Sequence, residues 1–151
     1  MNWLLDFLHN PFLLTVLLAF VSAQTLKVIT HAIVYKEFDI KRFLGDGGMP
    51  SAHTATVSSL ATFTGVSFGL DSFEFAICAM LTLIVCRDAV GVRMETGKQT
   101  QIINELRSLI ESKETIEIKL KEFVGHTPLQ VTMGLLLGVA VGIAVSFVIK
   151  I

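Results

Sequence analysis

Long apolar stretches alternate with shorter polar segments along the chain. Each stretch approaches the length of about 20 residues that a helix needs to cross the hydrocarbon core of a bilayer. The four stretches are Phe12–Val34, Ser51–Leu70, Ser72–Val92 and Pro128–Ile149. In a chain of 151 residues they leave too little polar surface to cover them in water. The pattern therefore predicts an all-α integral membrane helix bundle of about four transmembrane helices, forming a single domain over residues 1–151.

The composition agrees with a membrane protein. Hydrophobic residues make up 52% of the chain and charged residues 17%, whereas about a quarter of the residues of an average soluble protein are charged. This balance excludes a free-standing DNA-binding domain. The formal net charge of -1 also argues against nucleic acid as a partner.

Basic residues gather in two of the segments that connect the apolar stretches. These segments are the one between the first and second stretches and the one between the third and fourth, whereas the N-terminus and the connection near Asp71 have none. Lysine and arginine are retained on the cytoplasmic side of a membrane. We therefore expect a protein of the cell (inner) membrane, with both basic segments on the cytoplasmic side and both termini on the outer side.

The long connection over about Arg93–Thr127 has a pattern of its own. Apolar residues recur in it at helical spacing: Ile102, Ile103, Leu106, Leu109 and Ile110. This spacing predicts an amphipathic helix that lies on the membrane surface or on the spans. Residues Glu114–Lys121 alternate between polar and apolar, and a short strand, an extended loop or an irregular helix would fit them equally well.

Two histidines stand at the starts of the second and fourth stretches, on the expected cytoplasmic side. His53 follows a glycine-rich segment that includes Gly48, and His126 precedes Thr127 and Pro128, which suit the cap and first position of a helix. Free N–H groups and the helix dipole make such starts favourable for anions. Glycine also lets the backbone approach a phosphate closely. We therefore expect two anion-binding helix ends side by side.

Charged residues reach the same membrane level. Lys27 shares a helix face with Gln24 and His31 in the first stretch, and the third stretch ends with Arg87, Asp88 and Arg93. Cleavage of a phosphate ester through a phosphohistidine needs such a set. One imidazole attacks phosphorus, the second protonates the leaving alcohol, and cations offset the charge on the phosphoryl oxygens.

Four motifs together resemble a known family. They are Gly-Gly-Met-Pro-Ser-Ala-His-Thr at residues 47–54, Arg-Asp-Ala-Val-Gly-Val-Arg at 87–93, Gly-Lys-Gln at 97–99 and Gly-His-Thr-Pro at 125–128. The chain is similar over most of its length to the divergent branch of the type 2 phosphatidic acid phosphatase superfamily, also described as acid phosphatase/vanadium-dependent haloperoxidase-related proteins. The resemblance implies a membrane phosphatase in which His53 is the general acid, Ser51 binds phosphate and His126 is the nucleophile.

The chain also departs from the motifs of the broader superfamily. Gln130 stands where an aspartate would activate the nucleophilic histidine, which leaves Asp88 as a substitute if the third stretch packs beside the fourth. No Ser-Arg pair lies five residues before His126, so Arg87 or Arg93 would have to bind the phosphate. Lys27 would take the part of the first-motif lysine, although the full Lys, six residues, Arg-Pro motif is absent.

The expected function is a phosphatase that acts on a phosphorylated lipid, such as phosphatidic acid, phosphatidylglycerophosphate or a polyprenyl phosphate or diphosphate. The expected catalytic residues are His53, His126 and Asp88. The expected substrate-binding residues are Lys27, Gly48, Ser51, Arg87, Arg93, Lys98 and Gln130, although Lys98 fits the surface of the amphipathic helix equally well. No spacing resembles a metal-ligand motif, and we expect neither a metal nor a cofactor.

Two other functions remain open from the sequence. A degenerate relative would bind anionic lipid or phosphate without hydrolysing it, and Gln130 supports this alternative. A small transporter or assembly subunit ranks lower, because the second and fourth stretches carry few polar residues on their outer halves. The stripe formed by Gly134, Gly138 and Gly142 indicates close helix packing, either within the chain or between the subunits of a homo-oligomer.

Overall fold

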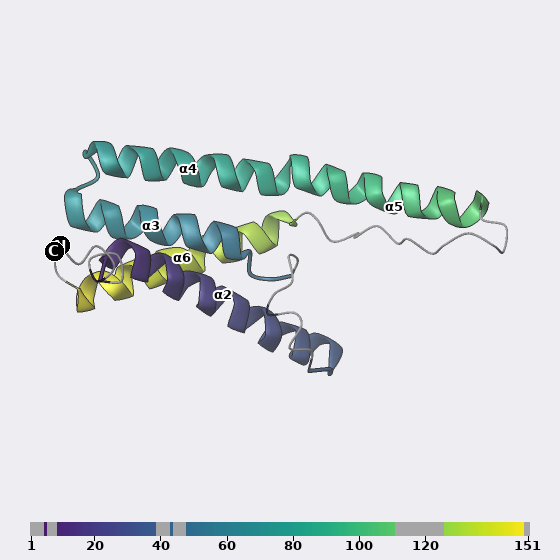
Figure 1. Ribbon diagram of the computed structural model, residues 1–151, viewed down its shortest axis with the longest axis horizontal. Helices are drawn as coiled ribbons and strands as arrows, with labels where there is room; N and C mark the ends of the chain where they lie inside the picture. The colour runs from purple at the N-terminus through teal and green to yellow at the C-terminus, as the bar shows by residue number, and fades with distance from the viewer. Residues whose placement is uncertain (1–4, 6–8, 39–42, 44–47, 111–125, 150–151) are drawn as a thin grey trace.

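The computed structural model describes residue 5, residues 9–38, residue 43, residues 48–110 and residues 126–149 of the chain (Figure 1). The described residues are almost all helical and contain no strand, which confirms the all-α class. The helices are α2 (Pro11–Tyr35), α3 (Ala52–Phe68), α4 (Phe73–Val90), α5 (Val92–Ile110) and α6 (Pro128–Val148).

Short polar side chains begin four of these helices. Asn10, Ser51, Ser72 and Thr127 each stand at the N-cap, with a side-chain oxygen that accepts a hydrogen bond from a backbone N–H of the first turn. Such caps satisfy N–H groups that have no partner within the helix. The expected start of the fourth stretch, with Thr127 as cap and Pro128 at the first helical position, is confirmed.

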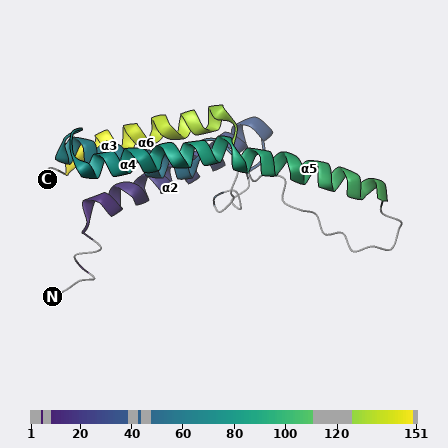
Figure 2. The same cartoon turned by 90° about the horizontal axis from the view of Figure 1, so that it is seen from above.

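Helix α3 lies at the centre of the bundle, in contact with α2, α4 and α6 (Figure 1). Helices α2 and α4 flank it, and within the described part of the chain they do not contact each other. The view in Figure 2 shows α6 running along α3 on the side away from the start of α2. The start of α2 and the end of α6 therefore lie at one end of the bundle, and α3 and α6 both start from the other end.

Three of the described helices are long and apolar enough to cross a membrane. They are α2, α4 together with its continuation into α5 as far as Leu106, and α6. Helix α3 is apolar but has 17 residues, a length of about 25 Å at 1.5 Å per residue, against about 30 Å for the bilayer core. It is shorter than the expected second stretch because Gly69, with φ of 92°, ends it and a short turn leads into α4.

The long connection after α4 differs from the expectation. Helix α4 ends at Val90, and after Gly91 the chain continues as α5, which extends from the bundle roughly in line with α4 (Figure 1). The amphipathic helix therefore starts earlier than its apolar pattern indicated. It continues α4 instead of lying on the other spans, and Ile102, Ile103 and Leu106 are exposed. The side chains of 109 and 110, residues 114–121 and the basic residues at 41, 42, 113, 119 and 121 lie outside the described residues.

The glycine stripe of α6 packs against α3 of the same chain. A Cβ atom added at Gly138 would lie 2.0 Å from Oγ of Ser58 and 2.3 Å from the carbonyl oxygen of Ala55, both on α3. A Cβ atom at Gly134 would lie 2.5 Å from the carbonyl oxygen of Ser51, the cap of α3, and one at Gly142 would lie 2.8 Å from that of Ser59 on α3. At this close approach Oγ of Ser58 donates a hydrogen bond to the carbonyl of Leu135, at 3.3 Å. Of the two uses that the sequence left open, the structure shows packing within the chain.

Substitution of Gly138 by alanine should therefore destabilise the protein. The new methyl group would meet the backbone of α3, which cannot move aside as a flexible side chain could, and such overpacking costs about 1–3 kcal/mol of the free energy of unfolding. Thermal unfolding followed by helical circular dichroism in detergent micelles measures the effect. Ala140→Leu is the matched control, because Ala140 is exposed on the same helix. Equal melting temperatures for Gly138→Ala and the native protein would contradict the packing.

Candidate functional site

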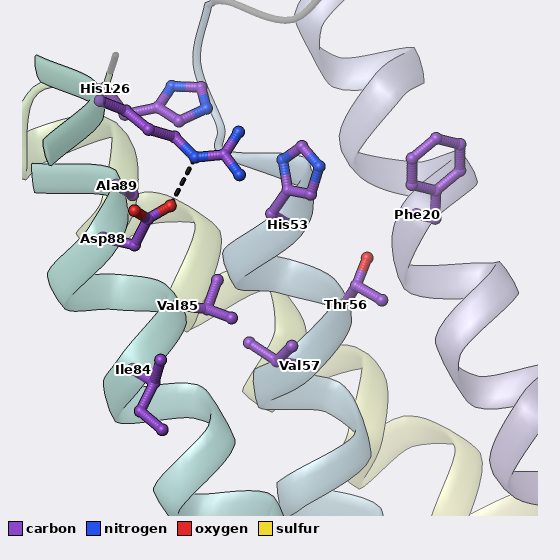
Figure 3. Close-up of a pocket in the computed structure, with 10 residues that line it drawn as sticks. Phe20, His53, Thr56, Val57, Ile84, Val85, Asp88, Ala89 and His126 are labelled. Carbon is purple, nitrogen blue, oxygen red and sulfur yellow. Dashed lines mark hydrogen bonds and ion pairs between the residues drawn. The ribbon is translucent and has the colours of Figure 1, made fainter. Parts of the chain in front are cut away.

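A cavity of about 320 Å³ lies at the end of the bundle where α3 and α6 begin (Figure 3). One part of it is polar, with His53, His126 and the pair formed by Asp88 and Arg93, and the remainder is mainly apolar. The residues that line it are Phe20, His53, Thr56, Val57, Ile84, Val85, Asp88, Ala89, Arg93 and His126. Two histidines that are 73 positions apart in the sequence thus face one space.

A backbone hydrogen bond brings the two helix starts together. The N–H of Ser51, the cap of α3, donates to the carbonyl of Gln130 in the first turn of α6, at 3.0 Å. His53 lies in the first turn of α3 and is exposed to the cavity. The structure thus has the side-by-side arrangement of helix starts that the sequence indicated.

His126 is held by contacts from two further elements. Its backbone N–H donates to the carbonyl of Ala89 near the end of α4, at 3.3 Å. Its ring Nδ1 lies 3.2 Å from Oε1 of Gln130. With 7% of its surface exposed, the imidazole has a position and a ring orientation that the surrounding helices determine.

The contact with Gln130 also determines which ring nitrogen carries the proton. Oε1 of Gln130 accepts a hydrogen bond from the backbone N–H of Thr127, at 3.0 Å, as part of a capping box. Because a backbone N–H can only donate, the side-chain atom facing it must be the amide oxygen. The same oxygen faces Nδ1 of His126, so Nδ1 must donate, and in the neutral ring Nε2 keeps its lone pair. That is the state a nucleophilic imidazole needs.

Asp88 does not hold either imidazole. Its Oδ2 forms an ion pair with Nε of Arg93, on the first turn of α5 (Figure 3). The expectation that Asp88 replaces the activating aspartate is therefore not met, because Gln130 occupies the Nδ1 side of His126. Both members of the pair still line the cavity, and the guanidinium has further N–H groups that can bind phosphate.

Lys27 reaches the site from α2. Its side chain is buried, with 6% exposed, and its charge acts on His126. Gly48 packs along it, since an added Cβ there would lie 3.8 Å from Cγ of Lys27. Gly48 has φ of 96°, a conformation that favours glycine. Both residues thus lie beside the cavity without lining it.

Three expected substrate-binding residues are not brought to the cavity. Arg87 does not line the cavity and lies instead in a neighbouring surface hollow, which shares Ile84 and Asp88 with it. Lys98 lies on α5 beyond the bundle and pairs with Glu95 at 2.7 Å. Ser51 is fully buried as the cap of α3, and its Oγ accepts a hydrogen bond from Oγ1 of Thr54, at 3.1 Å.

The sequence reasoning missed the apolar walls of the cavity. Phe20, Thr56, Val57, Ile84 and Val85 line it, and all lie inside stretches that read simply as membrane spans. The helical spacing could have placed Phe20 near the site, because Phe20 precedes Gln24 by four positions and so shares the helix face of Gln24 and Lys27. Among the described residues no three His, Cys, Asp or Glu side chains are grouped as they would be to hold a metal ion.

The environment of His126 lowers the pKa of its imidazole. Burial is the main cause, since it disfavours the charged form, and the charges of Lys27, His53 and Arg93 act in the same direction. The hydrogen bond to Gln130 acts in the opposite direction and raises the pKa. His126 is therefore neutral at pH 7, with Nε2 available.

Ring chemical shifts of labelled histidine, followed against pH in micelles, should show His126 titrating below the ordinary value of about 6.5. Lys27→Met should raise this pKa because a repelling charge is lost, whereas Gln130→Leu should lower it further. Since the unfolded chain takes up the proton more readily, the free energy of unfolding should fall as the pH drops below about 6.5. Loss of the signal in His126→Gln assigns it, and shifts of the opposite sign in the two variants would contradict the geometry.

Comparisons with known proteins identify the family of the chain. The sequence profile of the family described as the Divergent PAP2 family matches residues 8–141. The chain is also similar to the uncharacterized membrane protein YuiD of Bacillus subtilis (strain 168), with 36% identity over 155 residues, which cover 95% of this chain and 98% of the relative. No solved structure shows a significant match. The matched residues include both histidines of the cavity, and the chain belongs to the Divergent PAP2 family of membrane proteins.

Proposed function

We propose that this protein is a lipid-phosphate phosphatase that works through a phosphohistidine. The cavity is the observation that carries the proposal. It joins two imidazoles and a guanidinium to an apolar wall contributed by α2, α3 and α4. A phosphate head group fits the first part and a hydrocarbon chain fits the second.

In the first step Nε2 of His126 attacks phosphorus, and the bond between phosphorus and the lipid oxygen breaks. His53, in its protonated form, gives a proton to that oxygen, and the lipid leaves as an alcohol. In the second step water attacks the phosphohistidine while His53 takes a proton from the water. Inorganic phosphate leaves and His126 returns to its neutral form. Arg93 and Lys27 offset the charge on the phosphoryl oxygens in both steps.

The arrangement of the helices supports a lipid as substrate. Because α2 and α4 flank α3 without contacting each other, the face of α3 between them carries the cavity. Phe20 on α2 and Ile84 on α4 are exposed at its sides. A lipid can enter sideways from the bilayer, with its head group at His53 and its chain along α3.

A binding protein without catalysis is the second candidate, and Gln130 favours it. A neutral amide orients the ring of His126 but does not stabilise an imidazolium as a carboxylate does. Such a protein would hold a phosphorylated lipid in the same cavity and release no phosphate. The formation of a covalent phosphohistidine separates the two candidates.

His126→Ala should abolish the release of phosphate from phosphatidic acid or a polyprenyl phosphate in micelles. His53→Ala should slow it by about 10²–10⁴-fold, the usual contribution of a general acid. An aryl phosphate, whose leaving group needs no proton, should be affected much less by His53→Ala. Rapid quenching with ³²P-labelled substrate should trap label on the native chain and none on His126→Ala.

His9→Ala is the matched control for these variants, because His9 lies next to the start of α2, at the opposite end of the bundle. It should keep native turnover. Native protein that binds the lipids but neither releases phosphate nor traps label would establish the binding function instead.

We further propose that the cavity faces the cytoplasm, because Lys36 and Arg93 lie at its end of the bundle and basic residues favour that side. Glu37 is exposed at this end and Asp71 at the other. With Cys78 and Cys86 replaced by alanine, a cysteine introduced by Glu37→Cys should be shielded from an impermeant thiol reagent in intact cells, and one introduced by Asp71→Cys should react. The reverse pattern would place the cavity outside.

A further inference from the structure

Gln24 is a buried polar residue whose hydrogen bonding is incomplete. It lies in the middle of α2 with 5% of its surface exposed, and its side-chain oxygen Oε1 has no hydrogen-bond partner in the described part of the chain. Nearly all buried polar atoms in folded proteins have a partner, because an unpaired one has lost its water without replacement. An unpaired amide oxygen inside a membrane bundle therefore requires a donor that the described part of the chain does not supply.

The position of Gln24 connects it to the proposed site. Phe20, Gln24 and Lys27 are four and three positions apart, so they share one face of α2. Phe20 lines the cavity, and the charge of Lys27 acts on His126. Gln24 lies between them along this face, about 4.5 Å along the helix axis from Lys27, and it does not itself line the cavity. Its neighbour Ala23 packs against Ala52 and Ala55 in the first turn of α3, next to His53.

The chemistry of the head group limits what the donor can be. A fully ionised phosphate monoester offers only acceptor oxygens, so the phosphate that Lys27 and Arg93 attract cannot satisfy Gln24. A hydroxyl group on the carbon next to the phosphate ester can donate, and Gln24 lies within one helical turn of Lys27, whose charge acts on His126. Polyprenyl phosphates have no such hydroxyl, whereas glycerol phosphates with a free hydroxyl beside the phosphate do.

We propose that Gln24 is a specificity-determining residue that accepts a hydrogen bond from a hydroxyl beside the phosphate of the lipid head group. The inference rests on the proposed function, which places the phosphate at His126. It names the substrate class as phosphorylated glycerol lipids with a free hydroxyl next to the phosphate ester. A water molecule is the competing donor, and it would confer no such preference.

Two lipids that differ in one hydroxyl test the inference on the full-length protein in micelles. The first is 1-acyl-glycerol 3-phosphate, and the second is its 2-deoxy counterpart with the same acyl chain. The native protein should turn over the first with a kcat/KM about 10-fold higher, the usual effect of one buried hydrogen bond. Gln24→Leu should lose this preference through slower turnover of the hydroxyl lipid, with the deoxy lipid little affected.

Thr25→Val is the matched control. Thr25 is the next residue of α2, is exposed on the outside of the bundle and donates its hydroxyl hydrogen bond to the carbonyl of Val21 in its own helix. This variant should keep the native preference. Gln24→Leu should also unfold at a temperature equal to or above that of the native protein, because it removes an unpaired buried group. Gln24→Met serves as a second apolar variant if the leucine packs poorly.

The outcomes separate this inference from the phosphatase proposal. Equal turnover of both lipids by the native protein, or a preference that persists in Gln24→Leu and Gln24→Met, would overturn the role of Gln24 and leave the phosphatase in place. If the protein does not turn over either lipid, titration calorimetry measures the binding of the same two lipids instead. Tighter binding of the hydroxyl lipid that disappears in Gln24→Leu would support the inference while contradicting the phosphatase, and equal binding would overturn it.

Discussion

The close approach of α3 and α6 is the contact on which the arrangement of the site depends. It requires glycine at 134, 138 and 142, because side chains at these positions would collide with the backbone or the short side chains of α3. Two helices that run in the same direction at this distance have their first turns side by side, and the bond from Ser51 to Gln130 fixes their register. The glycine stripe of α6 thus determines where the two histidines meet, although neither histidine belongs to the stripe.

Gln130 shows how one residue serves both the fold and the chemistry. As the third residue of α6 it completes the capping box with Thr127, and this folding role fixes the orientation of its amide. The fixed amide then determines the tautomer of His126. Orientation and charge are divided between two residues here, since Gln130 orients the ring of His126 without charge and the nearby carboxylate of Asp88 pairs with Arg93.

The sequence gives the all-helical class, the caps and the meeting of His53 with His126, because hydrophobic periodicity and helix-start signals are local properties. It does not give the partner of Asp88. Asp88 and Ala89 line the cavity whereas Arg87 does not, and the packing of α4 on α3 decides which side of α4 faces it. The apolar walls of the cavity could not be predicted either, since the sequence does not distinguish Phe20 and Val57 from ordinary lipid-facing residues.

The separation of α2 from α4 has a consequence for the way in which the proposed lipid ligand would reach the cavity. A molecule that enters between them moves only within the plane of the membrane, and its hydrocarbon chain never has to pass through water. The frequency of encounter is then set by the mole fraction of the ligand among neighbouring lipids instead of by its concentration in the surrounding solution. An amphiphile of very low solubility is therefore as accessible to this bundle as a soluble one.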